Sequence, residues 1–236
     1  MRGWQLVKRT IDLMIATAGL ILGSPVFALV ALAVLVLEGR PIFYVSRRHV
    51  TPEKTVRIFK FRSMVRDATS PHYRLAERFM KDGFLDIPLS CEVFTPVGRF
   101  LERTQLVELP QLLNVLIDGM SLIGNRPLPP ENVRLLRQKY PRAVGRFDAP
   151  AGISGIAQVV GKLNLQPEQR LALELGYVDL YRKGNIVRCD TLVLIYTVRV
   201  LLGGPGVTLD QARWMLHPIQ CDPMSIASAA TTSGEA

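Results

Sequence analysis

The sequence has few cysteines, and they are not grouped. Cys91, Cys189 and Cys221 are the only three among 236 residues, and their separations match no metal-ligand spacing. This excludes a zinc module or a disulfide-dense secreted scaffold, so we expect reduced thiols. The length suits one domain, with or without a membrane attachment, and lets the chain bury a core without cross-links. No internal repeat is present.

Acidic residues are outnumbered, with 20 against 29 basic ones, which gives a formal net charge of +9 and a pI of about 9.8. Such a balance suits nucleic acid, an anionic membrane surface or a phosphate-rich substrate. The chain contains no nucleic-acid-binding motif, and basic residues flank its apolar segment. We therefore expect membrane lipid, and no nucleic acid, among its partners.

Charged side chains are absent from residues 13–37, while the mean hydropathy of the chain is +0.20. This run exceeds the roughly 18–20 apolar residues of a membrane helix. Lys8 and Arg9 precede it, and Arg40, Arg47 and Arg48 follow it. Because both flanks are basic, charge asymmetry gives no orientation.

Three interpretations of this run compete. A cleaved signal peptide is disfavoured because the run is too long and no polar mature start follows it. A single-pass anchor and a re-entrant helix both fit the length. Ser24-Pro25 near the middle favours the re-entrant helix, since proline kinks a helix and Ser24 can hydrogen-bond to the freed carbonyl. Both basic flanks would then stay in the cytoplasm, with Asp12 near the interface and paired with Lys8 or Arg9.

The remaining chain is predicted to be mainly α-helical with one short β-hairpin. Strands are expected within 41–62 around a turn at 51–54, and helices at 72–82, 99–116, 131–140 and 168–181. Loops are expected at 83–98, 124–130 and 150–161. Residues 190–202 read equally well as an interfacial amphipathic helix or a buried core helix. Residues after about 225 are predicted to be disordered.

Four clusters could bind phosphate. Lys60 and Arg62 would share one face of a strand, and Glu108 and Gln111 one face of a helix, although a solvated edge strand and a solvent-facing helix side explain these patterns as well. Arg126 lies in a Gly/Pro loop, which favours a rigidly held anion receptor. Residues 150–159 contain small residues and the donor Gln158, a weak signal alone.

The order and spacing of these motifs resemble the bacterial sugar transferases, the monotopic polyprenyl-phosphate phosphoglycosyl transferases, from about Lys8 to Leu202. The matching motifs are Lys8-Arg9 with Asp12, Ser24-Pro25, Gly39-x-Pro41 with Arg48, Lys60-Phe61-Arg62-Ser63-Met64, Thr95 with Gly98-Arg99-Phe100-Leu101, Glu108-Leu109-Pro110-Gln111 with Asn114-Val115, Met120 to Pro127, Gly152 to Gln158, and Tyr177 with Asp190.

The resemblance implies a monotopic membrane protein with an N-terminal re-entrant helix (1–40), a catalytic-type domain at the cytoplasmic face of the bacterial inner membrane (41–222) and a tail (223–236). It implies transfer of a phosphosugar from a nucleoside diphosphate sugar to a polyprenyl phosphate, with Mg²⁺, as the first step of glycan or exopolysaccharide assembly. Lys60, Arg62, Gln111, Arg126 and Gln158 would bind substrate. The oligomeric state is left open, a homo-oligomer included.

One departure bears on the chemistry. The family motif begins with the aspartate that forms a covalent phosphosugar intermediate, and this chain has Val107 at that position. Asn125 replaces a usual proline, and Asp118-Gly119 inverts the usual order. Three hypotheses follow. In the first, Glu108 holds Mg²⁺ and the lipid phosphate attacks directly, or Glu108 is itself the nucleophile. The second is a non-catalytic membrane scaffold or binding relative, and the third is an enzyme with altered chemistry or substrate.

Overall fold

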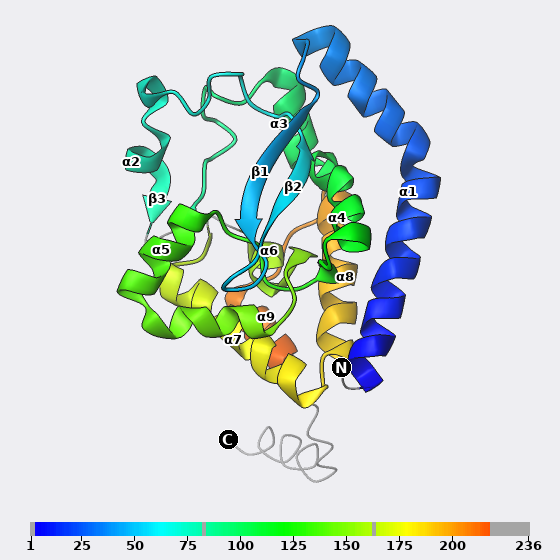
Figure 1. The fold of residues 1–236 in the computed structure, drawn as a ribbon, viewed down its shortest axis with the longest axis vertical. Helices are drawn as coiled ribbons and strands as arrows, with labels where there is room; N and C mark the ends of the chain where they lie inside the picture. The colour runs from blue at the N-terminus through cyan, green and yellow to red at the C-terminus, as the bar shows by residue number, and fades with distance from the viewer. Residues whose placement is uncertain (1–2, 82–83, 162–163, 218–236) are drawn as a thin grey trace, which may run out of the picture.

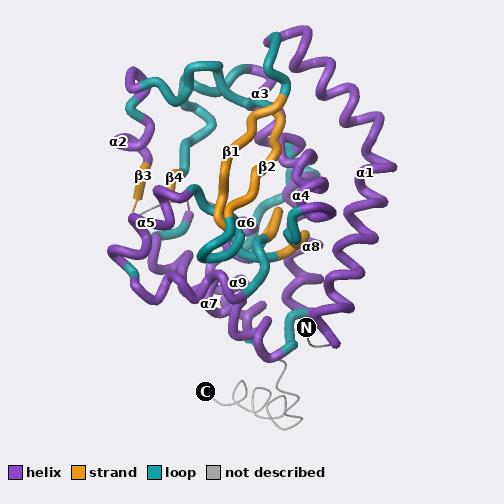
Figure 2. The backbone as a smooth tube through the Cα atoms, viewed as in Figure 1, coloured by secondary structure: helices purple, strands orange, loops and turns teal. Residues whose placement is uncertain are grey.

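The computed structural model describes residues 3–81, 84–161 and 164–217, and in these the chain is mainly helical, with three short two-stranded sheets (Figures 1 and 2). The predicted tail lies outside these residues. In chain order the elements are α1 (Gly3–Glu38), β1 (Phe43–His49), β2 (Thr55–Phe61), η1 (Pro71–Tyr73), α2 (Leu75–Phe79), β3 (Met80–Lys81), β4 (Phe84–Leu85), α3 (Pro96–Arg103), η2 (Leu106–Gln111), α4 (Leu112–Ile117), β5 (Ser121–Ile123), α5 (Pro130–Lys139), η3 (Pro141–Asp148), β6 (Gly152–Ser154), α6 (Ile156–Val160), α7 (Pro167–Lys183), α8 (Val187–Leu201) and α9 (Leu209–Leu216).

The predicted hairpin is confirmed as the antiparallel pair β1–β2, in which Tyr44 lies opposite Lys60 and Arg48 opposite Val56. Directly opposite residues point to the same side of a sheet, so Arg48 and Lys60 share one face. Ile58, on that face between Val56 and Lys60, is 1% exposed. The hairpin therefore directs two basic side chains toward the interior.

Helix α1 is long and apolar enough to cross a membrane, with a mean hydropathy of 2.8 over an 18-residue window, which indicates membrane association. Pro25 cannot donate to the carbonyl of Ile21, and the Ser24 hydroxyl donates to that carbonyl at 2.8 Å instead. This is the local rescue that the sequence predicts. The helix stays continuous through Ser24 and Pro25 and bends along its course (Figure 1), so the proline does not end the helix.

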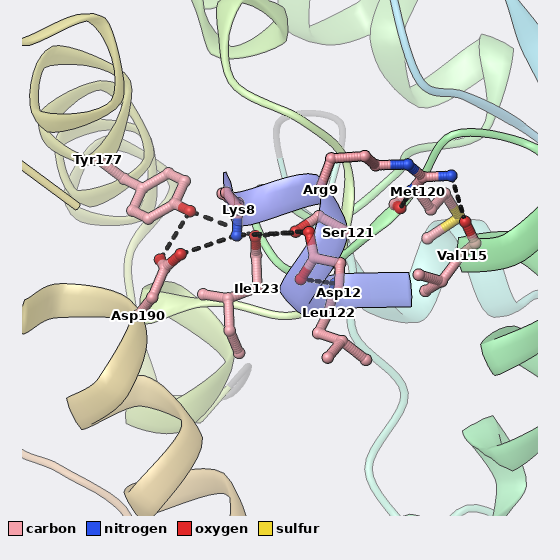
Figure 3. A network of polar contacts seen from close by, with 10 residues as sticks. All are labelled: Lys8, Arg9, Asp12, Val115, Met120, Ser121, Leu122, Ile123, Tyr177 and Asp190. Atoms are coloured by element: carbon pink, nitrogen blue, oxygen red, sulfur yellow. Dashed lines mark hydrogen bonds and ion pairs between the residues drawn. The ribbon is translucent and has the colours of Figure 1, made fainter. Parts of the chain in front are cut away.

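The first turns of α1 are tied to the domain by a polar network (Figure 3). Lys8 Nζ lies 2.7 Å from Asp190 Oδ2 and 3.7 Å from Asp12 Oδ2, so the predicted Lys8–Asp12 pair is present. The Ser121 hydroxyl donates to Asp12 at 2.7 Å, and the Tyr177 hydroxyl donates to Asp190 at 2.8 Å. The start of α1 is thereby held against β5, α7 and α8.

The last turn of α1 is held by Arg62. Its guanidinium donates to the carbonyl oxygens of Glu38 and Gly39 at 2.7 and 2.9 Å and lies 3.7 Å from the Glu38 carboxylate. A cation there satisfies carbonyls that a helix end leaves unpaired. Both ends of α1 are thus fixed to one domain, and the helix runs along its side (Figure 1).

Several predicted elements differ from the structure. The expected helix at 72–82 is divided into η1, α2 and β3, and the expected loop at 83–98 contains β4 and the start of α3. The expected loop at 150–161 holds β6 and α6, because β6 pairs in parallel with β5. The expected helix at 99–116 is divided into α3, η2 and α4: α3 ends at Arg103, before Gln105 adopts a left-handed conformation, and Pro110 lies within η2.

Helix α8 satisfies both interpretations of residues 190–202. Cys189 and Val193 are buried in the core cluster that α7 and α9 also form, while Leu194, Ile195 and Val198 are exposed. One face of α8 is therefore core and the opposite face is an exposed apolar surface.

Candidate active site

Three of the predicted site residues converge on one carboxylate oxygen. Lys60 Nζ lies 2.6 Å from Glu108 Oε1, and Arg126 donates to the same oxygen at 2.9 Å. Glu108 is only 7% exposed. Charge-assisted hydrogen bonds of this kind are the strong class, and burial strengthens them further. We refer to Glu108, Lys60, Arg126 and Arg48, described below, as the cationic cluster.

Each member of the cluster comes from a different segment. Lys60 projects from β2, and Glu108 lies on the 3₁₀ helix η2. The residue before η2, Gln105, adopts the left-handed backbone conformation (φ 56°). Arg126 follows β5, at the point where that strand meets β6. Because the segments are far apart in sequence, only the tertiary fold brings them together.

Close backbone packing positions the Arg126 loop. A Cβ added to Gly124 would lie 2.2 Å from the Pro150 carbonyl oxygen, and one added to Gly152 would lie 2.2 Å from the Gly124 nitrogen. No side chain fits at either position, so the two strands approach as only glycine allows. The loop that presents Arg126 is therefore rigidly supported.

A buried ion pair supports the same loop from α7. Arg146, 1% exposed, forms bonds of 2.7 and 2.9 Å to the two carboxylate oxygens of Glu174 and donates to the carbonyl oxygen of Arg126 at 2.8 Å. The Asn125 amide donates to the carbonyl of Arg146 at 2.8 Å. Asn125 thus has a structural role that proline, with no side-chain donor, could not perform.

Arg48 is a further cation of this site that we did not propose as substrate-binding from the sequence. Burial, together with the nearby positive charge of Arg126, lowers the pKa of Arg48 to about 10. The cluster therefore holds three cations around one contacting carboxylate. The strand alternation of the hairpin is the signal that could have found Arg48, since it places Arg48 on the same face as Lys60.

The pKa values of the other two cations report the same crowding of positive charge. Burial lowers the pKa of Lys60. The negative charge of Glu108 raises that pKa only in part, and the positive charge of Arg126 lowers it further. For Arg126 burial also acts against the charge, but the attraction and hydrogen bond of Glu108 raise the pKa overall. An added anion would relieve the repulsion among the three cations.

The other residues predicted to bind substrate, Gln111, Gln158 and Arg62, have different surroundings from the cationic cluster. Gln111 follows Glu108 by three residues on η2 and is 2% exposed, and its Nε2 has no hydrogen-bond partner among the described residues. Gln158 donates to the carbonyl of Ile153 at 3.1 Å and so braces the loop after β6. The predicted pairing of Lys60 with Arg62 is wrong, because β2 ends at Phe61 and Arg62 turns to the end of α1.

The cluster does not fit a resident Mg²⁺. Mg²⁺ prefers oxygen ligands, commonly one or two carboxylates with substrate phosphates. Two cations already occupy Glu108 Oε1, and the described residues contain no group of three histidines, cysteines or carboxylates that could hold a metal. The buried Nε2 of Gln111 is a donor, which suits an anion better than a cation. Metal binding by Glu108 thus stays a prediction without geometric support.

Comparison with known proteins assigns the family. The family model for bacterial sugar transferases matches residues 3–204. The chain belongs to this family. It is 34% identical over 187 residues to the UDP-glucose:undecaprenyl-phosphate glucose-1-phosphate transferase of Escherichia coli. The aligned region covers 74% of this chain and 36% of that protein.

Two further relatives show how much of each protein is shared. A UDP-N-acetylgalactosamine-undecaprenyl-phosphate N-acetylgalactosaminephosphotransferase of Aeromonas hydrophila is 30% identical over 85% of this chain and 44% of its own length. The uncharacterized sugar transferase EpsL of Bacillus subtilis is 30% identical over 86% of this chain and 90% of its own length. The chain therefore spans less than half of the first two relatives.

The lowered pKa of Lys60 gives this sugar transferase a testable pH dependence. As pH rises, Lys60 loses its charge at a lower pH than an ordinary lysine, so the affinity of the cluster for a phosphate-bearing anion should fall before pH 10.5. Arginine keeps its charge to a much higher pH. Isothermal titration calorimetry with UDP between pH 7 and 10 should show a smaller loss of affinity in Lys60→Arg than in the wild type. The control Lys183→Arg, at an exposed lysine, should lose affinity with pH as the wild type does. The same pH dependence of affinity in all three proteins would contradict a role of Lys60 in binding.

Proposed function

We propose that this sugar transferase transfers a phosphosugar from a nucleoside diphosphate sugar to a polyprenyl phosphate at the cytoplasmic face of the bacterial inner membrane, as the first step of glycan or exopolysaccharide assembly. The observation that carries the proposal is the cationic cluster, in which two partly buried cations contact one buried carboxylate and a third, Arg48, lies within electrostatic range. This excess of positive charge favours a ligand with several phosphate charges, and the two relatives are named for reactions of UDP-sugars with undecaprenyl phosphate.

The cluster can support the reaction through positioning and charge neutralisation, which account for most catalysis of phosphoryl transfer. An oxygen of the lipid phosphate forms a bond to the sugar-linked phosphorus of the donor. The bond from that phosphorus to the bridging oxygen breaks, and the nucleoside monophosphate leaves with the electron pair. Arg126, Lys60 and Arg48 would bind the diphosphate and stabilise the charge on the departing phosphate.

Glu108 offers a two-step alternative. Its carboxylate would attack the same phosphorus and release the nucleoside monophosphate, and the lipid phosphate would then displace Glu108 from the phosphosugar. One carboxylate oxygen of Glu108 is already bound by Lys60 and Arg126, and these contacts would have to weaken before that oxygen could attack phosphorus. Direct attack by the lipid is therefore the pathway that we favour.

The attachment of α1 supports a re-entrant rather than a transbilayer helix. At 1.5 Å per residue, 36 residues span about 54 Å, well beyond the roughly 30 Å hydrocarbon core. Lys8 and Arg62 fix the two ends of α1 to the same domain. A transbilayer course would draw that charged domain into lipid. A bent helix lying in one leaflet would instead meet the membrane through its exposed apolar side chains, beside those of α8.

The test is a two-substrate assay on the full chain in lipid nanodiscs. UDP-sugars and undecaprenyl phosphate are added, and UMP and the lipid-linked product are measured. We expect UMP release that requires both substrates, and a loss of about 100-fold or more in kcat/KM for Arg126→Ala, as for a removed oxyanion donor. The control Arg137→Ala, on the exposed side of α5, should retain full activity.

A second candidate function is that of a non-catalytic binding relative. The observation that favours it is the packing of Val107, which is 1% exposed within an apolar cluster and cannot attack phosphorus. This alternative predicts UDP-sugar binding without UMP release from any donor, with or without Mg²⁺. That result in a folded protein would overturn the transferase proposal.

A further inference from the structure

A cavity of about 250 Å³ is lined by residues of α2, β3 and β4 and by the start of α7. Phe79 and Phe84 contribute aromatic walls, Asp86 contributes a carboxylate, and Lys81 lies on its exposed side. Sites that bury drug-sized ligands measure roughly 300–1,000 Å³. The cavity therefore suits a fragment of the size of a nucleoside rather than a complete nucleotide sugar.

The cavity has a fixed inner wall. Arg170, 7% exposed, binds Asp86 at 2.6 Å and stacks over the Phe84 ring at 4.3 Å from its centroid. At the outer side the Arg78 guanidinium lies 4.8 Å from the centroid of the Phe79 ring and pairs with Glu92 at 2.6 Å. Each phenylalanine ring is thus held by an arginine, which fixes the two aromatic walls.

The cavity is also physically joined to the Arg126 loop. Phe84 packs in the same core cluster as Leu128, two residues after Arg126. Arg170 and Glu174 are four residues apart on α7 and so share one face, and Glu174 holds Arg146 against the Arg126 carbonyl. The negative charge of Asp86 contributes to raising the pKa of Arg126, so the carboxylate lies within electrostatic range of the cluster.

We propose that this cavity binds the nucleoside end of the donor, while the cationic cluster binds its diphosphate; the inference rests on the proposed function. The partly exposed Phe79 ring offers a stacking surface, and nucleobases stack readily on aromatic side chains. Asp86 can accept hydrogen bonds from ribose hydroxyls or a base N–H, and Lys81 lies where the chain of phosphates could pass. The sugar would then lie beyond the diphosphate, toward the lipid acceptor.

The test compares a ligand with a base against one without it. Calorimetry on the full chain in nanodiscs should show UDP affinity about tenfold weaker in Phe79→Ala, the effect of losing one base–aromatic stack, with no change in affinity for inorganic diphosphate. Phe100→Ala, an exposed phenylalanine on α3, is the matched control and should leave both affinities unchanged. If Phe79→Ala does not fold, Phe79→Leu keeps the apolar volume without the ring and should give the same selective loss.

Other outcomes would overturn the inference. An unchanged UDP affinity in Phe79→Ala, or equal losses for UDP and diphosphate, would show that the cavity does not hold the base. A loss confined to UDP-glucose, with UDP unaffected, would assign the cavity to the sugar. Binding can be measured without turnover, so the two proposals can fail separately. UDP binding that depends on Phe79, without any UMP release, would support the cavity assignment and overturn the transferase proposal. UMP release together with UDP binding that does not depend on Phe79 would support transfer and overturn the cavity assignment.

Discussion

Replacing Glu108 with glutamine should abolish turnover and lower the free energy of unfolding by about 3–5 kcal/mol, the usual result of removing one partner from a buried ion pair. The carboxylate contacts Lys60 and Arg126 through one oxygen, and Arg48 lies close enough to sense its charge. A neutral amide would remove the carboxylate that contacts two of the three partly buried cations. Denaturant unfolding and the UMP-release assay measure the two effects.

Binding should respond in the opposite direction. Because Glu108→Gln makes the cluster more positive, its affinity for UDP should equal or exceed that of the wild type, even though turnover is lost. UDP at 100 times its Kd would then return about 2.7 kcal/mol of the lost stability. Glu102→Gln is the matched control, since Glu102 hydrogen-bonds to Ser63 and influences Lys60 and Arg126 only at longer range. A Glu108→Gln protein with wild-type stability and turnover would contradict the role of the cluster.

The candidate site was predictable from sequence where local geometry decides it. Glu108 and Arg126 stood out because a carboxylate within an apolar helix and an arginine between Gly124 and Pro127 are locally unusual. Their meeting with Lys60 depends on contacts that no local pattern encodes, since β2, η2 and the loop after β5 approach one another only in the fold. The resemblance supplied the grouping that spacing alone could not.

The errors have equally local causes. The alternation of side chains along a strand predicted that Arg62 lies on the same face as Lys60. The strand ends at Phe61, however, so this alternation does not determine the direction of the Arg62 side chain. The loop predicted at 150–161 contains β6, a three-residue strand that forms only because β5 lies beside it. The same pairing explains why Gly124 and Gly152 occur where they do. These features need a non-local partner, so periodicity could not reveal them.

The packing of α1 shows the clearest gain from the structure. Its apolar run and the Ser24-Pro25 bend could be read directly, yet nothing in the run itself indicates which side faces the domain. The structure places Val30 and Val34 in one apolar cluster with Phe61 and Val107, so Val107 belongs to the packing that holds α1 against the domain. The residue at position 107 therefore affects the attachment of α1 as well as the chemistry.

Placing an aspartate at position 107 should consequently create no covalent mechanism. Val107 is 1% exposed in a cluster with Val30, Val34, Phe61 and Leu101. Val107→Asp would place a carboxyl group among these side chains, and burial would raise its pKa by several units, at about 1.4 kcal/mol per unit. We expect a loss of about 3–5 kcal/mol in stability at pH 7 and no gain in UMP release.

The pH dependence of that loss separates charge from shape. When folding raises the pKa of an aspartate, its ionisation lowers stability only above the unfolded pKa of about 4. This part of the stability loss grows as pH rises toward the folded pKa. Val107→Asn, which has nearly the same shape but does not titrate, should lose stability by an amount that does not change between pH 4 and 7. Val107→Asp should match it near pH 4 and fall below it at pH 7. If Val107→Asp instead gained turnover at wild-type stability, residue 107 would have to reach the cationic cluster, and the apolar packing of η2 against α1 could not be the state in which the enzyme works.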